Sequence, residues 1–416
     1  MLRKIIKYTL RLLSIAVLSK YNPKVVAVTG SVGKSSAKEV IFTILNSAHS
    51  GRVRANIKNL NTEIGVPLTI IGGEDAQRNL WLWLKNIFKA LKLILIRDSN
   101  YPDILVLEMA ADRPGDIRYL TSFVFPDIAV VTAIGEMPAH LEFFPERDGY
   151  ISEKANVLKS LKPRGAAILN YDDLSVRDLR DKVPTDRARI YYGFQDGAEV
   201  KLESFSYKIP SFAKEIGESG MSFKVSYAGD EAEFFIKKTL GAPSLYACLA
   251  GAAAGLKLGL NLGQMAESLK KYIPPHSRLE LLEGIKETII IDDSYNASPL
   301  ATEAALGLLS EFKKNRRIAV LGSMRELGIN TEKAHRLAGS AAAKVCDMVF
   351  LVGDEMVFAR EELEKKKFIL GQNLFWFETS DDAKLKIQAV LEPGDAVLIK
   401  GSRGVRMDKI VEEVKA

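Results

Sequence analysis

The feature that most constrains this chain is the stretch 29–36, which reads TGSVGKSS and directly follows the apolar run at 25–28. An apolar run that meets a glycine turn and then helix-forming residues predicts a buried strand, a tight loop and a helix. Gly30 and Gly33 give the loop the freedom to curl its N–H groups toward phosphate oxygens. We therefore predict a phosphate-binding loop of a shortened type, because Val28 stands where the usual first glycine would be.

The polar residues of this stretch are those that nucleotide chemistry requires. Lys34 could reach the terminal phosphates, and the Ser35 hydroxyl could ligate Mg²⁺. Ser31 and Ser36 complete the predicted nucleotide-binding set. The helix expected from about residue 34 to 45 adds the partial positive charge of its N-terminus. The alternative interpretation is a strand–turn–helix corner that binds no ligand.

Length and composition are those of a globular protein with more than one domain. The 416 residues suggest two or three domains, and 47% hydrophobic with 26% charged residues is ordinary for such a protein. Cys248 and Cys346 provide neither a disulfide framework nor a metal-binding spacing, which favours a reducing cytoplasm. Residues 1–24 contain six basic residues and no acid, which equals the net charge of +6. The remainder is balanced, so we expect no nucleic-acid surface.

Two segments could either contact a membrane surface or pack on the protein itself. Residues 1–23 predict an amphipathic helix, and their longest uncharged stretch of eight residues is far below the roughly 20 that span a bilayer. Residues 79–97 predict a second helix, with Lys85, Lys89 and Lys92 on one face and apolar residues on the others. For both segments, peripheral membrane contact and packing against the body of the protein are the two interpretations.

Strands and helices alternate along most of the chain, which predicts βαβ units. We expect an N-terminal helix at 1–23, a central domain at 24–273 and, after a linker with Pro274-Pro275, a C-terminal domain at 277–416. The fold class is α/β, with a P-loop ATPase-type parallel or mixed sheet in the central domain and a Rossmann-like C-terminal domain. Alternating segments within 188–239 predict an antiparallel flank. The main strands are expected at 25–29, 104–109, 127–132, 166–169, 288–292, 316–321, 347–352 and 395–399.

Polar residues follow several of these strands, where the carboxyl ends of an open parallel sheet line a ligand crevice. Glu108 ends one strand, and a carboxylate facing the phosphate loop could ligate Mg²⁺. His140 follows another strand and could be a ligand or simply exposed. Lys154 by itself has the pattern of an ordinary helix lysine. Each of these residues, taken alone, could be structural.

Two more clusters lie in the second half of the chain. Asp293 and Asn296, in DDSYNASP at 292–299, could hold a ribose or cap a helix. Lys400, Ser402 and Arg403 follow a strand near the C-terminus. They could bind a carboxylate or a phosphate, or form a solvated turn.

Together these segments resemble the Mur ligases, the ATP-dependent amide ligases of cell-wall peptide synthesis. Their order and spacing, rather than any one segment, carry the resemblance. Within the family the chain is most similar to the member that adds D-alanyl-D-alanine to a muramyl tripeptide. The matching segments are TGSVGKSS, NLNTEIGVP (59–67), VLEMAADRPGDI (106–117), AHLEFF (139–144), SEKANVLK (152–159), DDSYNASP, LGSMRELG (321–328) and IKGSRGVRMDKIV (399–411).

The resemblance implies a role for each candidate residue. Lys34 and Ser35 would hold the ATP phosphates and Mg²⁺, with Glu108 and His140 at the metal site. Lys154 matches a lysine that is carbamylated in the family, where the carbamate supports the Mg²⁺ site. The other implied residues are Arg278, Asp293 and Asn296 for ATP, Asn61, Thr62 and Glu63 near the reacting carboxylate, and His335, Lys400, Ser402 and Arg403 for the incoming dipeptide.

The implied reaction joins a carboxylate to an amine through an acyl phosphate, with ADP and phosphate as products. The partners would then be small peptide or amino-acid substrates, and we expect a cytoplasmic monomer that could also lie at the membrane surface. Two other functions fit the same segments. One is a related ligase acting on a polyglutamate-like or lipid-linked acid, and the other is a nucleotide-binding scaffold without catalysis.

Three departures from the family pattern bear on recognition. About 23 residues stand in the place of the family's UDP-binding domain, which would leave a UDP group without a dedicated pocket. Ala247 stands where an adenine-contacting Asn is expected, which implies weaker or backbone-mediated recognition of the base. Ser323 replaces an acidic residue on the side of the amine substrate.

Overall fold

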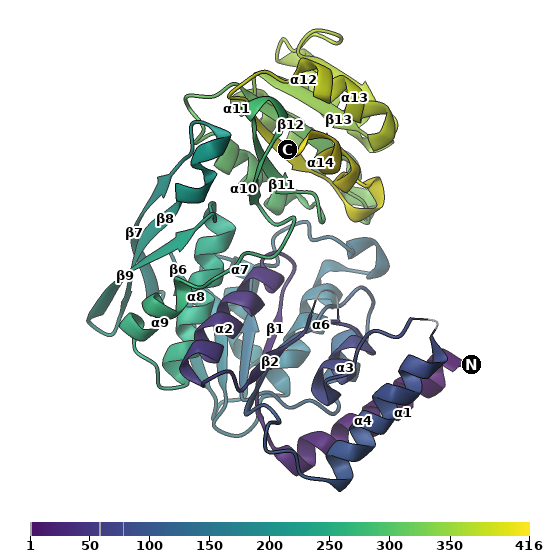
Figure 1. The fold of residues 1–416 in the computed structure, drawn as a ribbon, viewed down its shortest axis with the longest axis vertical. Coiled ribbons are helices and arrows are strands. Elements are labelled where there is room, and N and C mark those ends of the chain that lie inside the picture. Colours follow the sequence, from purple (N-terminus) through teal and green to yellow (C-terminus); the bar gives the residue numbers. More distant parts are fainter. Residues whose placement is uncertain (1, 58–59, 78) are drawn as a thin grey trace.

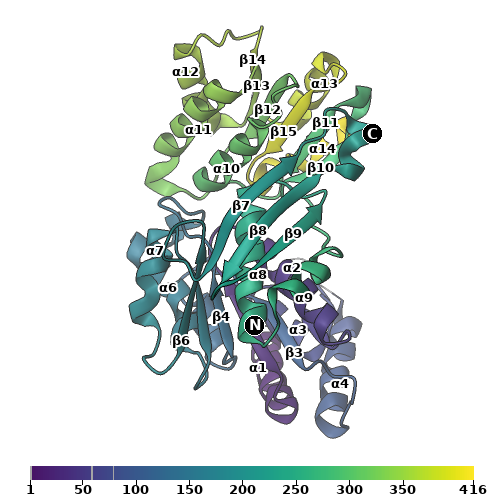
Figure 2. The ribbon, with the colours of Figure 1, turned by 90° about the vertical axis from the view of Figure 1, so that its left-hand side faces the viewer.

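The computed structural model describes residues 2–57, 60–77 and 79–416, and it contains two sheets in separate parts of the molecule (Figures 1 and 2). The first sheet has nine strands in the order β2-β3-β1-β4-β5-β6-β7-β8-β9, and the second has six in the order β10-β11-β15-β12-β13-β14. Helices cover both sheets, so the predicted α/β class with two sheet-based parts is confirmed. Met1 of the predicted N-terminal helix and Asn59 of the NLNTEIGVP segment lie outside the described residues.

The nine-stranded sheet is parallel from β2 to β7 and antiparallel from β7 to β9. The prediction of an antiparallel flank across 188–239 is therefore wrong for β6. The helical turns of α7 (Leu174–Arg177) and η2 (Asp178–Lys182) reverse the chain before β6 begins, so that β6 runs parallel to β5. The strands are β1 (Lys24–Thr29), β2 (Val53–Ala55), β3 (Ile104–Glu108), β4 (Ile128–Val131), β5 (Ala166–Asn170), β6 (Ala188–Gly193), β7 (Val200–Lys208), β8 (Gly220–Tyr227) and β9 (Asp230–Lys237).

The six-stranded sheet is parallel except for β10, which pairs antiparallel with β11. Its four inner strands coincide with predicted strands, whereas the two edge strands were not predicted from the sequence. The strands are β10 (Glu280–Glu283), β11 (Ile289–Asp293), β12 (Arg317–Gly322), β13 (Met348–Val352), β14 (Leu374–Phe377) and β15 (Ala396–Lys400).

Both faces of each sheet are covered, as expected for parallel strands that read as continuous apolar runs. In β1, Val26 and Val28 belong to one core and Val25 and Ala27 to the other. The first core includes α2 (Lys34–Ala48), α8 (Ala242–Lys257) and α9 (Leu262–Leu269), and the second includes α1 (Leu2–Tyr21), α3 (Gly65–Ile71), α4 (Leu80–Leu95), α5 (Asp116–Thr121) and α6 (Arg147–Lys159). The six-stranded sheet packs α10 (Pro299–Leu309), α11 (Thr331–Val345) and α12 (Val357–Lys365) on one face and α13 (Ser380–Val390) and α14 (Asp408–Val414) on the other.

The N-terminal helix is docked on the body of the protein. Leu10 and Val17 of α1 are buried in the core that also contains α3 and α4. The Lys20 ammonium donates hydrogen bonds to the carbonyls of Leu93 and Ile94, both at 2.9 Å. Within the described ranges, no helix combines the length and the apolar character needed to cross a membrane.

The strand order places the candidate site at the carboxyl ends of the inner strands of the nine-stranded sheet. β1 lies between β3 and β4, so the order of the strands reverses at β1. In such sheets the loops after the central strands diverge and leave a crevice at their carboxyl ends. The loops that follow β1, β3 and β4 therefore meet at one place, and they contain the phosphate-loop residues, Glu108 and Thr132.

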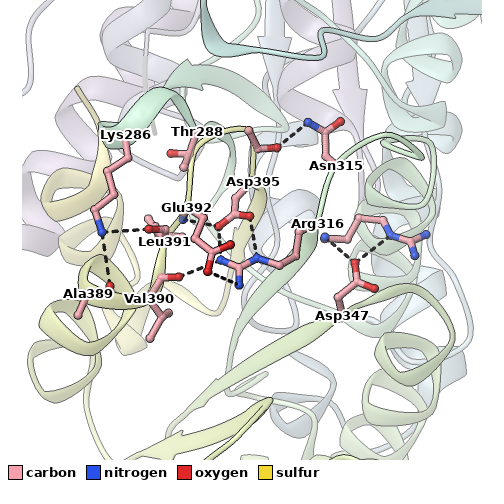
Figure 3. Close-up of polar contacts among 12 residues, drawn as sticks. Lys286, Thr288, Asn315, Arg316, Asp347, Ala389, Val390, Leu391, Glu392 and Asp395 are labelled. Atoms are coloured by element: carbon pink, nitrogen blue, oxygen red, sulfur yellow. Dashed lines mark hydrogen bonds and ion pairs between the residues drawn. The ribbon is translucent and has the colours of Figure 1, made fainter.

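A paired arginine and aspartate tie strands of the six-stranded sheet together (Figure 3). The Arg316 guanidinium donates to both carboxylate oxygens of Asp395, at 2.8 and 2.6 Å, and to the carbonyl of Val390 at 2.9 Å. Asp395 is only 2% exposed and also accepts the N–H of Glu392. Because Arg316 precedes β12 and Asp395 precedes β15, this bidentate pair fixes the start of two neighbouring strands.

We predict that Arg316→Ala lowers the free energy of unfolding by about 2–3 kcal/mol, because it leaves a buried carboxylate without its cation. The matched control is Arg52→Ala, which breaks a pair with Asp103 whose two side chains are half exposed. That change should cost less than about 1 kcal/mol. Denaturant unfolding of both variants measures the difference, and equal losses would contradict the role assigned to the Arg316 pair.

Candidate active site

The predicted phosphate loop joins β1 to α2, and its backbone is held by the end of β4. Gly30 has a φ of 141°, and a Cβ there would lie 2.0 Å from Thr132 Oγ1. The N–H groups of Ser31 and Val32 donate to the Ala133 carbonyl at 2.7 and 3.0 Å. These two N–H groups are therefore turned to the protein and not to a ligand. The first turn of α2, whose leading N–H groups have no partner within the helix, still offers donors that an anion could use.

Lys34 stands at the start of that turn, next to a second lysine. Its ammonium donates to the Ser31 carbonyl at 3.0 Å. Loss of water around the ammonium, followed by the charge of nearby Lys154, lowers the pKa of Lys34 to about 8. A cation held here at the N-terminus of a helix is placed to offset the charge of bound phosphates.

Lys154 projects from α6 and is 1% exposed. Its ammonium lies 4.8 Å from the centre of the Tyr150 ring, and the Tyr150 hydroxyl is 2.8 Å from Ser31 Oγ. Burial lowers the pKa of Lys154 to about 8, although Asp112 and other nearby carboxylates oppose the shift. Among the described residues this ammonium forms no hydrogen bond or ion pair. A buried cation that has an aromatic ring beside it but no hydrogen bond or ion pair is costly, which makes this position unusual for a purely structural lysine.

Glu108 ends β3 beside the loop and is 3% exposed. Asn61 donates to Glu108 Oε1 at 3.0 Å, so the structure brings together two residues that were predicted separately. Asn56 holds the backbone of Glu108 by donating to its carbonyl at 3.2 Å and accepting its N–H at 2.6 Å. The other carboxylate oxygen of Glu108 accepts no hydrogen bond from the part of the chain that the structure describes. An oxygen donor that is oriented but incompletely satisfied suits a hard cation such as Mg²⁺.

His140 lies where the two sheet-based parts meet, and its contacts within the described residues are with carboxylates other than Glu108. Its ring contacts Glu326, which follows β12, and its Nε2 is 3.6 Å from Asp112 Oδ1. Within the described residues, no group of three His, Cys, Asp or Glu side chains is arranged to hold a metal ion. The predicted metal set of Ser35, Glu108 and His140 therefore stays a prediction, and in this arrangement His140 serves as a bridge.

Arg278, which precedes β10 of the six-stranded sheet, contacts the phosphate loop. Its guanidinium donates to Ser35 Oγ at 3.4 Å and lies over the Tyr295 ring at 4.1 Å. Arg403 approaches the same ring at 5.7 Å. Two of the predicted site arginines therefore gather around Tyr295, on the side of the loop.

Other predicted substrate residues make internal contacts. Lys400 is buried and donates to Asp293 Oδ2 at 2.5 Å and to the Asn296 carbonyl at 3.0 Å. Burial raises the pKa of Asp293, and the Lys400 ammonium opposes that shift. Three residues that we expected to bind ribose or dipeptide thus form one hydrogen-bonded cluster at the ends of β11 and β15.

His335 and Ser402 are also engaged within the protein. His335 is fully buried, and its Nε2 accepts the Met324 N–H at 2.9 Å while Nδ1 donates to the Thr331 carbonyl at 2.7 Å. Ser402 Oγ accepts the Arg325 N–H at 2.9 Å. These contacts shape the loop after β12, and burial lowers the pKa of His335 so that its neutral form is favoured.

The two residues that follow Asn61 make contacts outside the predicted site. Glu63 pairs with Arg3 of α1 at 3.0 Å, and Thr62 Oγ1 accepts the Gly65 N–H at 3.4 Å. Of the three residues predicted near the reacting carboxylate, only Asn61 contacts another member of the predicted site.

A cavity of about 1630 Å³ extends from the loop into the space between the two parts. Its walls include Gly33 on one side, Ala247 and Tyr246 of α8 on another, and Leu300 and Leu337 from the second part. The position expected for an adenine-contacting residue therefore does line a ligand-sized cavity.

Sequence reasoning missed the two aspartates in this wall. Asp172 accepts the Tyr246 hydroxyl at 2.8 Å, and Tyr246 stacks on Phe194 with ring centres 4.2 Å apart. Asp173 accepts the N–H groups of Ile134 and Gly135, at 2.7 and 2.8 Å. The signal that could have identified them is a pair of carboxylates directly after the buried strand β5.

Fold and site together define a two-part α/β protein with a phosphate loop facing a cleft. Residues 84–254 match the Mur ligase middle domain, and residues 277–403 match the Mur ligase, glutamate ligase domain. The chain belongs to the Mur ligase family, whose members are ATP-dependent, ADP-forming ligases.

Individual relatives agree with this assignment. The UDP-N-acetylmuramoyl-tripeptide–D-alanyl-D-alanine ligase of Bacillus subtilis is 29% identical over 97% of this chain and 79% of its own length. A MurF ligase from Thermotoga maritima, solved in complex with ADP, is 26% identical with a TM-score of 0.77, over 98% of this chain and 83% of that one. MurF from Acinetobacter baumannii has the same fold, with a TM-score of 0.79 at 23% identity over 98% and 80% of the two chains.

We predict that Lys154→Met stabilises the fold at neutral pH in buffer free of carbon dioxide. The pKa of Lys154 falls from 10.5 to about 8 on folding, so below pH 8 the folded state bears the full cost of the buried charge. As pH rises from 8 toward 10.5 that cost disappears, and the advantage of the variant, at most about 3 kcal/mol, should shrink.

Thermal unfolding across pH 7 to 10.5 measures this difference. The control is Lys38→Met, because Lys38 is also buried but donates to the Asn56 carbonyl at 2.8 Å and contacts Glu39. That variant should be destabilised at every pH. A destabilised Lys154→Met protein at pH 7 would show that its ammonium is well satisfied in the fold.

Proposed function

We propose that this chain joins D-alanyl-D-alanine to the free carboxylate of a muramyl peptide, with ATP converted to ADP and phosphate. The observation that carries the proposal is the contact of Arg278 with Ser35, because it brings the second part of the molecule onto the phosphate loop. The name of the Bacillus subtilis relative supports the choice of substrates.

The reaction would proceed in two steps. A carboxylate oxygen of the acyl substrate bonds to the γ-phosphorus, and the bond from that phosphorus to the bridging oxygen of ADP breaks. The amine nitrogen then bonds to the acyl carbon and loses a proton, and the phosphate leaves. Each step develops or moves negative charge that the protein must neutralise.

Different residues of the chain would neutralise this negative charge. Lys34 and the first turn of α2 would hold the transferring phosphoryl group, and Arg278 would add a positive charge from the other side. Glu108 and the Ser35 hydroxyl would hold Mg²⁺, which supplies Lewis-acid stabilisation of phosphate charge when bound. Asn61 would orient the Glu108 carboxylate through its hydrogen bond. Closing the two parts over the cavity would exclude water from the acyl phosphate.

Lys154 is proposed to carry a carbamate. Its lowered pKa leaves a substantial fraction as neutral amine near pH 8, and that amine can bond to the carbon of CO₂ and release a proton. The product is an anion, which would replace the repulsion between Lys154 and Lys34 by attraction. That the ammonium forms no hydrogen bond or ion pair with the described residues supports this assignment.

We also propose a cytoplasmic enzyme that acts as a monomer on small molecules and does not bind nucleic acid. Both cysteines are buried free thiols, which fits a reducing compartment.

The first functional prediction concerns Lys34. Lys34→Ala should lower the rate of ADP formation by about 10²- to 10³-fold, because it removes a fixed positive charge from the transferring phosphoryl group. The assay follows ADP release with a muramyl tripeptide and D-alanyl-D-alanine, and each should be required. Lys159→Ala, on the exposed side of α6, serves as the control and should retain activity. ATP hydrolysis that needs neither substrate, or no turnover at all, would reject the ligase in favour of another nucleotide-binding role.

The second concerns the carbamate. With ¹³C-labelled bicarbonate, the protein should show a carbamate carbon signal that is absent from Lys154→Ala. The same variant should lose roughly 100-fold in activity, and added short carboxylates should restore part of it. Full activity of the variant in bicarbonate-free buffer would exclude the carbamate from the mechanism.

A further inference from the structure

The helices α1 and α4 form a two-helix layer at the end of the molecule that lies away from the six-stranded sheet (Figure 1). Their C-terminal ends are joined by hydrogen bonds. Lys20 donates to the carbonyls of residues 93 and 94, and the Tyr21 hydroxyl donates to those of residues 93 and 96. The two helices therefore present one continuous layer and not two independent elements.

Each helix buries only its inner side. Leu10, Ser14 and Val17 of α1 face the core, and so do Trp83, Asn86, Ala90 and Leu93 of α4. A helix turns once every 3.6 residues, so the residues placed halfway between these positions lie on the opposite side. That opposite side faces away from the protein in both helices.

The outward sides are apolar as well. We define the outer α1/α4 face as nine residues at helical spacing. They are Ile5 (55% exposed), Tyr8 (58%), Leu12 (66%) and Ile15 (39%) on α1, and Trp81 (81%), Leu84 (56%), Phe88 (71%), Leu91 (43%) and Leu95 (79%) on α4. Single exposed apolar residues are normal on protein surfaces, but a regular stripe on each of two adjacent helices marks an interaction surface.

Positive charge borders this face. Neither α1 nor residues 79–97 contain an acidic residue. Lys4 and Lys92 pair with no carboxylate within the described residues, and Lys7 and Arg11 lie over Tyr119, on a flank of α1. Lys85 and Lys89 occupy the flank of α4 that contacts residues 72–74, where Lys85 pairs with Glu74 at 3.0 Å and Lys89 donates to the Gly72 carbonyl. The surface is apolar along its middle and basic at both sides.

The arrangement of apolar and basic residues indicates which kind of partner the outer α1/α4 face binds. A second copy of the chain would bring the same basic borders together, and their repulsion would oppose a symmetric dimer. A bilayer that contains anionic lipids offers apolar chains beneath a layer of negative phosphates, which matches both parts of the pattern. Trp81, the most exposed residue of the stripe on α4, is of the type enriched where protein meets the lipid headgroups.

We propose that the outer α1/α4 face docks on an anionic lipid bilayer, with the two helices lying in the plane of the interface. The apolar stripe enters the boundary between headgroups and acyl chains, and the bordering lysines contact lipid phosphates. This inference goes beyond the proposed ligase reaction and does not depend on it. The six-stranded sheet lies away from these helices (Figure 1), and the residues that line the cavity of the candidate site belong to neither α1 nor α4, so docking leaves the cavity accessible to substrates.

The test is co-sedimentation of the full chain with vesicles of phosphatidylcholine alone or mixed with phosphatidylglycerol. Binding should need the anionic lipid and weaken with salt. The double change Trp81→Ser with Phe88→Ser should reduce binding by about tenfold or more at every salt concentration. Lys92→Glu should reduce it by about tenfold at low salt only. Two exposed controls outside this face, Leu385→Ser on α13 and Lys237→Glu on β9, should bind as the unchanged chain does.

Tryptophan fluorescence gives a second readout. The chain has three tryptophans, and of these Trp83 is 8% exposed and Trp81 is 81% exposed. Anionic vesicles should shift the emission to shorter wavelength, and Trp81→Phe should remove the shift while binding persists. These two measurements place Trp81 itself at the lipid surface.

Failure to bind anionic vesicles would overturn the proposal, and so would binding that the Trp81, Phe88 and Lys92 changes leave intact. A concentration-dependent dimer that is lost in the Trp81→Ser, Phe88→Ser protein would also overturn it, in favour of an interface between copies. The ligase function is tested separately. Lys34→Ala should still bind vesicles, and the Trp81→Ser, Phe88→Ser protein should still form ADP in solution.

Discussion

The close approach of Gly30 to Thr132 is the constraint on which the site depends. A side chain at position 30 would occupy the space of the Thr132 hydroxyl, and Thr132 in turn donates to the Thr29 carbonyl at 3.1 Å. Because of this contact, the loop after β1 packs directly against the end of β4. The N–H groups of residues 31 and 32 are then used by the Ala133 carbonyl, and the start of α2 is left open. The anion site is therefore the end of a helix, held in place by a neighbouring strand.

The electrostatic character of this place follows from burial. The charge of Lys154 contributes to the lowered pKa of Lys34, and Arg278 adds a third positive charge from the second part of the molecule. The nearby carboxylates raise the pKa of Lys154 but do not offset the loss of water around its ammonium. A site with an excess of buried positive charge is stabilised by an anionic occupant, and a polyphosphate or a carbamate provides one.

Contacts between the two parts are polar beside the phosphate loop and apolar between α8 and α10, where one buried cluster spans both parts. His140 meets Glu326, the Glu142 N–H donates to the Glu326 carbonyl at 3.4 Å, and Arg278 reaches Ser35. Polar contacts of this kind can be exchanged for ligand contacts at small net cost, while the apolar cluster shared by α8 and α10 keeps the two parts joined. The arrangement suits a ligase that must admit three substrates and then exclude water.

Strands and loops that a short stretch of residues specifies can be predicted from the amino-acid sequence alone. The inner strands β1, β3, β11 and β15 could be predicted because strands buried on both faces read as continuous apolar runs. The edge strands β10 and β14 have four residues each. β10 is half polar, and β14 is an apolar run too short to be told from a buried helical turn by its pattern. The loop residues Gly30, Gly33 and Lys34 could likewise be identified, since the backbone freedom and the charge they require are properties of single residues.

Which polar side chains remain available to a ligand depends on the packing of distant segments. Lys400 and His335 have the right chemistry for binding a ligand, but partners within the protein already occupy them. Lys400 donates to Asp293, which is 107 residues away along the chain, and His335 accepts the Met324 N–H, which is 11 residues away. Lys154 has an ordinary local sequence, and its burial becomes visible only when α6 is packed beside the loop. Hydrogen bonding and desolvation depend on neighbours brought together by the fold, and local sequence does not specify those neighbours.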